Sequence, residues 1–515
     1  MIKKLRGRFT TGRALVTTLL ILIQLVWFAT VFLNIIDYSL VLDALLRVFT
    51  VIMTLYLIRK NENPAYRMSW IILMGLLPIF GGLFYALFGN KRPSRRMAAQ
   101  VANQVAKDYG QAVSGAYPHL LEQDSRLASL SYYIEQTSNL PVYGDTRVDY
   151  YAAGELALEP LLEALRSAER YILLEFFIMN PGLFMDQVFE VLAQKADQGV
   201  EVRVIYDDFG CLTTLPSDFV AQMEAIGIKC LQFNPFTPVI SLAVNNRDHR
   251  KIVVVDGKVG FTGGMNLADE YINEIERFGY WKDNLIRLEG PGVWSLATLF
   301  LDMWNAFYPK KDINYETFKD DTLAEQALNL ADPSQGFVQV YGDTPLDNEP
   351  LGENVYRDML NIAQDYVYIY TPYLVISYEL QTAMTLAARR GVDVRLMTPG
   401  IPDKKMVFRM TRSYYRPLIE AGVKIYEFSP GFLHAKTFVA DDRLASVGTI
   451  NLDYRSLYLH FELSAMLYDH PVIPTIKADF LATQAQARQI TLADTRNTLT
   501  GMLWDAVLRI VAPFV

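Results

Sequence analysis

The sequence predicts an α/β fold of two similar lobes, in which helices flank mixed sheets, preceded by N-terminal transmembrane helices. Three observations predict it: residues 1–90 are strongly apolar, the later residues alternate strand-like and helix-like segments, and several short motifs occur twice in the same order. The expected organisation is a membrane segment of two to three hydrophobic helices at residues 1–90, an amphipathic connector at 91–135, a first lobe at 136–308, a linker at 309–336, a second lobe at 337–485 and a C-terminal amphipathic helix at 486–515.

Three hydrophobic runs lie in the membrane segment. Residues 14–36 are uncharged and long enough to cross a bilayer, residues 38–58 contain two charges, and residues 68–88 are broken by a proline. Clusters of Lys and Arg flank these runs, and such clusters stay in the cytoplasm. We therefore expect a multi-pass protein of the cell membrane, with two effective crossings and cytoplasmic lobes. A cleaved signal peptide fits less well because hydrophobic segments follow the first run.

The net charge of −8 is unevenly distributed. Residues 1–100 contain 13 Lys and Arg against three acidic residues, so they carry +10 and the remainder carries −18. A basic segment of this kind suits anionic lipid headgroups, and an acidic remainder disfavours a general nucleic-acid-binding protein. Only Cys211 and Cys230 are present, in no metal or disulfide pattern, which is typical of a reducing compartment.

The two lobes repeat the same succession of elements. The predicted pairs are strands at 171–178 and 366–370, helices at 186–197 and 380–390, and strands at 201–206 and 393–397. The pentapeptide Val-Tyr-Gly-Asp-Thr also occurs twice, at 142–146 and 340–344. A repeat of about 190 residues is too long for a solenoid unit and has the size of a duplicated domain.

One polar pattern occurs twice at identical spacing. It has the form H-x-K-x-x-x-x-D and is followed, 17 residues after its His, by an Asn in a Gly-rich turn. Its members are His249, Lys251, Asp256 and Asn266 in the first copy and His434, Lys436, Asp441 and Asn451 in the second. The repetition indicates two halves that build one active site. No metal site is expected, because nothing resembles the spaced His and Cys ligands of zinc.

These residue types suit a phosphodiester substrate. His and Lys two positions apart on a strand point to one face, so pairing of the lobes would bring two imidazoles and two ammonium groups together. Lys and the Asn amides would bind the phosphate oxygens, one imidazole would attack phosphorus, and the other would protonate the leaving alkoxide. Asp283 and Glu462 complete the predicted site as acceptors for the second imidazole N–H. For Asp256 and Asp441, which belong to the motif, a role in a turn or structural ion pair is favoured over direct catalysis.

The motifs resemble those of the phospholipase D superfamily, and more specifically those of bacterial cardiolipin synthases. The similar stretches are 246–251, 263–266 and 278–283 in the first lobe, 430–436, 445–449 and 451–456 in the second, and Asn63, Pro64, Trp70, Pro78, Gly81 and 85–89 in the membrane segment. Two features depart from the family pattern: Ile376 and Ser377 replace its usual Pro-Asp, and the run at 14–36 is additional.

The resemblance implies two phospholipase D-type lobes that transfer a phosphatidyl group from one phosphatidylglycerol to another. Glycerol would be released and cardiolipin formed through a covalent phosphohistidine. The family pattern makes His249 the nucleophile and His434 the acid and base. It implies no cofactor, and it implies phosphatidylglycerol and the bilayer as partners. The sequence leaves the oligomeric state open.

Other functions remain as alternatives. The same groups would serve a phospholipase D hydrolase, or a transferase that uses an acceptor such as phosphatidylethanolamine. A nuclease is disfavoured by the acidic lobes, and a non-enzymatic lipid-binding scaffold by the two intact motifs. Residues 404–415 are read as a solvated helix face or as a headgroup contact, and the apolar stripe at 499–514 as core packing in preference to membrane contact.

Overall fold

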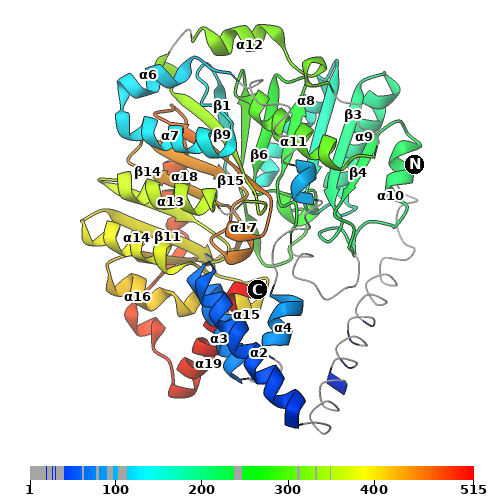
Figure 1. Ribbon diagram of the computed structural model, residues 1–515. Helices are drawn as coiled ribbons and strands as arrows, with labels where there is room; N and C mark the ends of the chain where they lie inside the picture. The colour runs from blue at the N-terminus through cyan, green and yellow to red at the C-terminus, as the bar shows by residue number, and fades with distance from the viewer. Residues whose placement is uncertain are drawn as a thin grey trace.

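The computed structural model describes residues 40–60, 63–76, 81–89, 97–101, 113–236, 246–309, 314–330, 333–347 and 349–514, together with the single positions 19, 22, 26, 29 and 30. The hydrophobic run expected at 14–36 therefore lies almost entirely outside the described residues. In the described part, two lobes stand side by side, and the helices labelled α2, α3, α4 and α19 lie together below the second lobe as drawn in Figure 1.

Each lobe is built on one mixed sheet. The first sheet has the strand order β1-β8-β6-β5-β2-β3-β4 and the second the order β17-β12-β11-β10-β14-β15-β16-β9. The first contains β1 (Arg147–Tyr151), β2 (Tyr171–Phe176), β3 (Glu201–Asp207), β4 (Lys229–Phe233), β5 (Ile252–Val255), β6 (Val259–Gly263) and β8 (Leu285–Glu289). The second contains β9 (Phe337–Asp343), β10 (Tyr366–Tyr370), β11 (Asp393–Pro399), β12 (Lys424–Phe428), β14 (Thr437–Ala440), β15 (Leu444–Gly448), β16 (Glu462–Tyr468) and β17 (Ala487–Ile490). Apart from β17, the two orders match strand for strand, which confirms the predicted pair of α/β lobes.

Helices cover both sheets and connect them. The first lobe has α8 (Gly154–Arg166), α9 (Leu183–Asp197), α10 (Phe219–Glu224) and α11 (Val293–Phe307), and the second has α13 (Leu351–Ile362), α14 (Tyr378–Arg389), α15 (Lys405–Ser413), α16 (Tyr415–Glu420), α17 (Tyr454–Tyr458) and α18 (Ile473–Gln484). Helix α11 packs against strands of both sheets. One continuous apolar core contains Trp304 of α11 together with Val254 of the first sheet and Val340 of the second. The lobes are therefore held together by a shared core as well as by the polypeptide chain.

The domain boundaries differ from the expected ones at two places. Strand β17 pairs with β12, so the second lobe continues to residue 490, and the C-terminal helix α19 (Leu499–Val511) begins later than predicted. The connector contains α6 (Ala116–Gln123) and α7 (Ser125–Ser138), and α7 packs on β9 and α13. The described part of the linker between the lobes contains the α-helix α12 (Asp321–Leu328) and two short 3-10 helices, Tyr315–Thr317 and Pro333–Gln335.

Three helices from residues 40–88 pack beside the C-terminal helix under the second lobe. Helices α2 (Leu40–Arg59), α3 (Pro64–Leu76) and α4 (Gly81–Phe88) pack on one another. The ring of Phe514 lies 5.4 Å from those of Tyr66 and Trp70, and Asn63 donates a hydrogen bond of 2.9 Å to the hydroxyl of Tyr458 in α17. We call this assembly of α2, α3, α4 and α19 the base.

The expected transmembrane helices are not found among the residues that the structure describes. Within the described ranges, no helix is both long enough and apolar enough to cross a bilayer.

The apolar stripe of α19 is exposed over its first half. Leu499 is 71% exposed, Leu503 62% and Val507 45%, whereas Leu508, which lies off that stripe, is 1% exposed. The expectation of core packing is therefore wrong for this half of the stripe. The buried side of α19 includes Leu508, and the stripe of Leu499, Leu503 and Val507 faces outward.

Candidate active site

The two motif histidines lie where the lobes meet, on segments that pair across the interface. Short strand β13 (Gly431–Leu433) runs parallel to β7 (Tyr280–Lys282) of the first lobe, and Asp248 forms the equivalent parallel bridge with Phe461. The amide of His249 donates to the carbonyl of Phe461 at 2.9 Å, and the amide of His434 donates to that of Lys282 at 2.7 Å. This backbone pairing fixes which residue of one lobe faces each histidine of the other.

Each histidine is held by a carboxylate from the opposite lobe. Nδ1 of His249 lies 3.0 Å from Oε2 of Glu462, and Nδ1 of His434 lies 2.7 Å from Oδ2 of Asp283. In both cases the carboxylate follows directly after the residue that pairs with the histidine segment. A carboxylate on Nδ1 holds the proton there and leaves the lone pair of Nε2 free. The sequence nominated both carboxylates but did not show that they are exchanged between the lobes.

Burial keeps both imidazoles neutral, whereas the adjacent histidines keep both carboxylates ionised. His249 and His434 are each 7% exposed, and Asp283 and Glu462 are fully buried. Desolvation, with a contribution from the neighbouring Lys251 charge, lowers the pKa of His249 to about 3 despite Glu462. Desolvation and the Lys436 charge lower the pKa of His434 to about 4. Although burial alone would raise the pKa of Asp283 and that of Glu462, the adjacent histidines hold both below the usual range.

The two motif lysines are buried beside the histidines. Lys251 and Lys436 are each 1% exposed, and each ammonium group donates to the carbonyl oxygen of the histidine two residues earlier. Desolvation lowers the pKa of Lys251 to about 8 and that of Lys436 to about 7. The Lys251 charge also acts on His434 and Lys436 of the other lobe, so the four groups share one electrostatic environment. They can stabilise an anion placed between them.

The motif asparagines are buried next to this cluster but differ in their contacts. Oδ1 of Asn266 accepts from the amide of Ile178 at 3.0 Å, and Nδ2 donates to the hydroxyl of Tyr271 at 2.8 Å. The ring of Tyr271 stands edge-on to that of His434, with centroids 5.4 Å apart. Asn451 is 6% exposed, and its Oδ1 has no hydrogen-bond partner among the described residues. Part of the donor capacity predicted for Asn266 is thus used to position Tyr271.

The motif aspartates lie away from the histidines and hold the backbone. Asp256 accepts three hydrogen bonds of 2.8 Å from the amides of residues 169–171, and Asp441 accepts three of 2.7 to 2.9 Å from the amides of residues 364–366. Both adopt a positive φ of 54°, which Asp tolerates better than most residues. Each stands seven residues after its histidine, roughly 20 Å along an extended chain. This geometry fits the structural role that the sequence favoured, and it does not fit membership of the catalytic set.

The motif segments are less regular than expected. His249 and Lys251 precede β5, and His434 and Lys436 lie between β13 and β14, so neither pair is inside a regular strand. Their conformation is set by pairing with the other lobe rather than by a neighbour in their own sheet.

Several residues that contact the site were not predicted to do so. Thr449 donates its hydroxyl hydrogen to Glu462, and Trp281 packs beside His434 with ring centroids 5.4 Å apart. His460 packs beside His249 at 5.7 Å between centroids. The first lies in the Gly-rich turn of the motif, and the other two flank the predicted carboxylates, so position in the motif was the only sequence signal.

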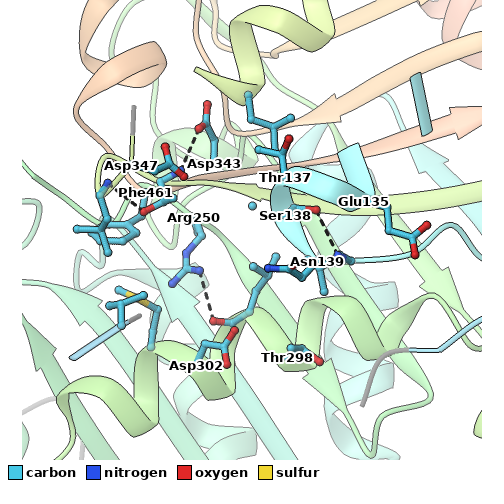
Figure 2. A pocket seen from close by; sticks show the side chains of 18 of the residues that line it. Glu135, Thr137, Ser138, Asn139, Arg250, Thr298, Asp302, Asp343, Asp347 and Phe461 are labelled. Atoms are coloured by element: carbon cyan, nitrogen blue, oxygen red, sulfur yellow. Dashed lines mark hydrogen bonds between the residues drawn. The ribbon is translucent and has the colours of Figure 1, made fainter. Parts of the chain in front are cut away.

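A cavity has a volume of about 620 Å³, and Figure 2 shows residues that line it. Arg250 and Phe461 line it, and these residues are the chain neighbours of His249 and Glu462. Its other charged lining residues are the carboxylates of Glu135, Asp302, Asp343 and Asp347. Arg250 is itself ion-paired with Glu175 at 2.8 Å and with Asp248 at 3.1 Å. An anionic phosphodiester would be repelled here, so this cavity is a poor substrate site.

The basic stretch at 404–415 forms part of helix α15. Arg409 pairs with Asp505 of α19 at 2.8 Å, and Arg412 pairs with Glu427 at 2.7 Å. These two ion pairs connect α15 to β12 within the second lobe and to α19 of the base. At the position of the family's Pro-Asp, the hydroxyl of Ser377 accepts from the amide of Leu380 and begins α14.

Comparison with known proteins agrees with this geometry. The family described as "Cardiolipin synthase, PLD-like domain" matches residues 161–278 and 356–483, and the family described as "Phospholipase_D-nuclease N-terminal" matches residues 48–90. An uncharacterized protein of Streptococcus mutans is 43% identical over 90% of this chain and 99% of its own length. A cardiolipin synthase of Geobacillus kaustophilus is 35% identical over 84% of this chain and 85% of its own.

Among solved structures, the phosphatidylserine synthase of Haemophilus influenzae superposes with a TM-score of 0.58. It covers 75% of this chain and 100% of its own, at 16% sequence identity, so this likeness supports the fold alone. The sequence relatives support more than the fold, because their matches include both copies of the motif. The chain therefore belongs to the cardiolipin synthase family of phospholipase D-like enzymes, which are phosphatidyltransferases.

Proposed function

We propose that this enzyme transfers a phosphatidyl group from one phosphatidylglycerol molecule to the hydroxyl of a second, releasing glycerol and forming cardiolipin. The observation that carries the proposal is the reciprocal arrangement of His249 with Glu462 and of His434 with Asp283. It supplies one neutral imidazole that can attack and a second that can handle protons. The relatives that carry the name cardiolipin synthase support phosphatidylglycerol as the substrate.

In the first step, Nε2 of His249 attacks phosphorus. Glu462 accepts the hydrogen bond from Nδ1–H and stabilises the positive charge that develops on the ring. A P–N bond forms, and the bond between phosphorus and the glycerol oxygen breaks. The departing alkoxide takes a proton from His434. The phosphate charge between Lys251 and Lys436 is neutralised in this step, because both ammonium groups point to the site.

His434 becomes protonated only in the complex with substrate. In the free enzyme its pKa is lowered to about 4 by burial and by Lys436, so the imidazole starts neutral. A bound phosphodiester places a negative charge beside it, and an opposite charge favours the protonated form. In the second step the hydroxyl of the second phosphatidylglycerol gives its proton to His434 while its oxygen attacks phosphorus and the P–N bond breaks.

The base is proposed to hold the enzyme on a bilayer. Apolar side chains of α2, among them Val41 and Leu55, are more than half exposed, as are Leu499 and Leu503 of α19. Helices α2 and α19 lie together at one end of the molecule (Figure 1). A contiguous exposed apolar surface of this kind is typical of membrane contact. We propose that residues 1–90 continue this attachment into the bilayer and that the lobes face the cytoplasm. Attachment raises the local concentration of lipid alcohol and so favours transfer over hydrolysis.

The function is tested by incubating the full-length protein in detergent with phosphatidylglycerol alone and analysing lipids and headgroups by mass spectrometry. Cardiolipin and glycerol in equal amounts are expected. Phosphatidic acid as the main product would mean that water is the acceptor. If product appeared only after phosphatidylethanolamine is added, the acceptor would be a different lipid.

The two histidine roles are tested with a phosphatidyl ester of p-nitrophenol, whose leaving group departs without a proton. His434→Asn should still release p-nitrophenol once per enzyme and retain a labelled phosphatidyl group. His249→Asn should release none. The opposite pattern would exchange the two roles, and Asn in place of His keeps a polar side chain of similar size.

A further inference from the structure

His460 has no hydrogen-bond partner in spite of its position at the site. It is 9% exposed, and neither ring nitrogen has a partner among the described residues. Its Nδ1 lies 3.7 Å from Oε1 of Glu462, beyond hydrogen-bond distance. The same Oε1 lies 2.9 Å from Nδ1 of His249, so the Glu462 carboxylate stands between the two imidazoles. Buried polar atoms without partners destabilise a fold, and in native proteins they usually have a reason.

Packing does not explain the histidine. The register across the interface makes His460 the counterpart of Trp281, because Phe461 corresponds to Lys282 and Glu462 to Asp283. Trp281 fills the space beside His434 with an apolar ring at 5.4 Å, and His460 fills the equivalent space beside His249 at 5.7 Å. Both rings leave nitrogen atoms without a hydrogen bond among the described residues, one in Trp281 and two in His460, but only an imidazole nitrogen has a lone pair that can bind a metal.

The donor atoms around His249 form a potential metal site. One ligand atom from each of His249, His460 and Glu462 lies within 4.8 Å of the others. Two donors bound to one tetrahedral zinc ion at about 2.1 Å are about 3.4 Å apart, so closing this site needs the donor atoms to approach by roughly 1–1.5 Å. Two imidazoles and one carboxylate are the protein ligands of many zinc centres that leave the fourth coordination position open. Magnesium and calcium prefer oxygen ligands and fit this set poorly.

We propose that His249, His460 and Glu462 bind a divalent transition-metal ion of the zinc type, and that this ion reversibly blocks the enzyme. Binding requires neutral imidazoles and an ionised carboxylate.

The blockade follows from the chemistry of imidazole. If the metal takes the lone pair of Nδ1 of His249, the remaining proton resides on Nε2, and no lone pair is left to attack phosphorus. If the metal takes Nε2, the attacking lone pair is used directly. In both cases Glu462 becomes a metal ligand and no longer accepts a hydrogen bond from Nδ1–H of His249. The consequence for turnover rests on the proposed role of His249 as nucleophile, whereas the binding itself does not.

The test uses the full-length protein in detergent, stripped with a chelator and then titrated with Zn²⁺ against a chromogenic indicator. Co²⁺ provides a second probe, because its visible absorption reports tetrahedral nitrogen and oxygen ligands. The variants are His460→Asn and His460→Gln, with His119→Asn as the matched control, since His119 is exposed on α6. Thermal unfolding of each variant shows that it is folded.

We expect one tightly bound Zn²⁺ per chain, an intense Co²⁺ spectrum, and loss of phosphatidylglycerol turnover in proportion to metal occupancy, restored by chelator. Both His460 variants should bind at least about tenfold more weakly and resist inhibition to the same degree, whereas His119→Asn should behave as wild type. Wild-type affinity in both His460 variants would overturn the site. If the protein bound Zn²⁺ through His460 but showed no turnover without metal, the site would stand and the proposed function would fail. If the enzyme turned over phosphatidylglycerol but bound no metal, the proposed function would stand and the metal site would fail.

Discussion

Replacement of Glu462 by Gln removes the charge on Nδ1 of His249 with almost no change of shape. The amide can also donate to Nδ1 and so favour the tautomer that carries its proton on Nε2, which cannot attack. During attack a positive charge develops on the ring, and the carboxylate oxygen lies 3.0 Å from Nδ1. At an effective dielectric constant of about 20, two unit charges at that separation interact by about 5 kcal/mol, which corresponds to roughly a ten-thousandfold change in rate. The charge in the transition state is partial, so we expect kcat to fall by about a hundredfold to ten-thousandfold.

The measurement separates the two lobes' carboxylates. With phosphatidylglycerol, both Glu462→Gln and Asp283→Asn should be slow. With the p-nitrophenyl donor, which needs no acid, release should remain slow in Glu462→Gln but recover in Asp283→Asn, because Asp283 acts through His434. Glu349→Gln, at an exposed carboxylate that accepts from Tyr133, serves as the control. A folded Glu462→Gln enzyme within about tenfold of wild type, or equal behaviour of both variants with the activated donor, would refute the assignment.

Three further predictions follow from the same geometry. The pKa is about 8 for Lys251 and about 7 for Lys436, so kcat/KM should decline as pH rises through 7 to 8 because the lysines lose the charge that binds phosphate. It should also decline below about pH 4 as the motif imidazoles protonate. A flat profile from pH 6 to 9 would contradict this prediction. Asp256→Asn keeps a residue that tolerates positive φ but weakens three hydrogen bonds to backbone amides. It should lower the free energy of unfolding by about 2–4 kcal/mol and leave kcat within a few-fold of wild type at permissive temperature. A large loss of kcat with unchanged stability would instead indicate a catalytic aspartate. Leu503→Glu should weaken binding to anionic vesicles while activity in detergent persists, and Leu156→Glu, on an exposed position of α8, should not.

The sequence predicted the internal structure of each lobe well because that structure depends on local patterns. The strand expected at 366–370 is found at those residues, and the one expected at 171–178 ends two residues earlier. Both are apolar and fully buried, as strands covered on two faces must be. The repeated pentapeptide shows the limit of such reasoning. Residues 340–343 lie within β9, whereas the copy at 142–146 precedes β1 and forms only a bridge from Tyr143 to Val338 of β9. Identical residues thus have different partners, because one copy contacts the other lobe.

The site was predictable as a list of residues but not as an arrangement. Repetition identified His249 and His434, yet the exchange of carboxylates depends on the register of two short parallel pairings between lobes, which no periodicity in the chain encodes. The same holds for the proposed metal ligands. His249 and His460 are 211 residues apart, so they have none of the close spacing by which zinc sites are found in a sequence.

The exchange of carboxylates also bears on why the duplicated lobes remain on one chain. Separated from its partner, each lobe would keep a histidine and lysine but lose the carboxylate that fixes the imidazole tautomer, so neither lobe contains a complete half-site. Pairing of two identical lobes would restore the carboxylates but would place the same residue beside both histidines. In the fused chain the residue beside His249 is His460 and the residue beside His434 is Trp281, so the two imidazoles have different surroundings. Fusion therefore allows a symmetric fold to place an imidazole beside the proposed nucleophile and an indole beside the proposed acid, so the two histidines need not share one environment.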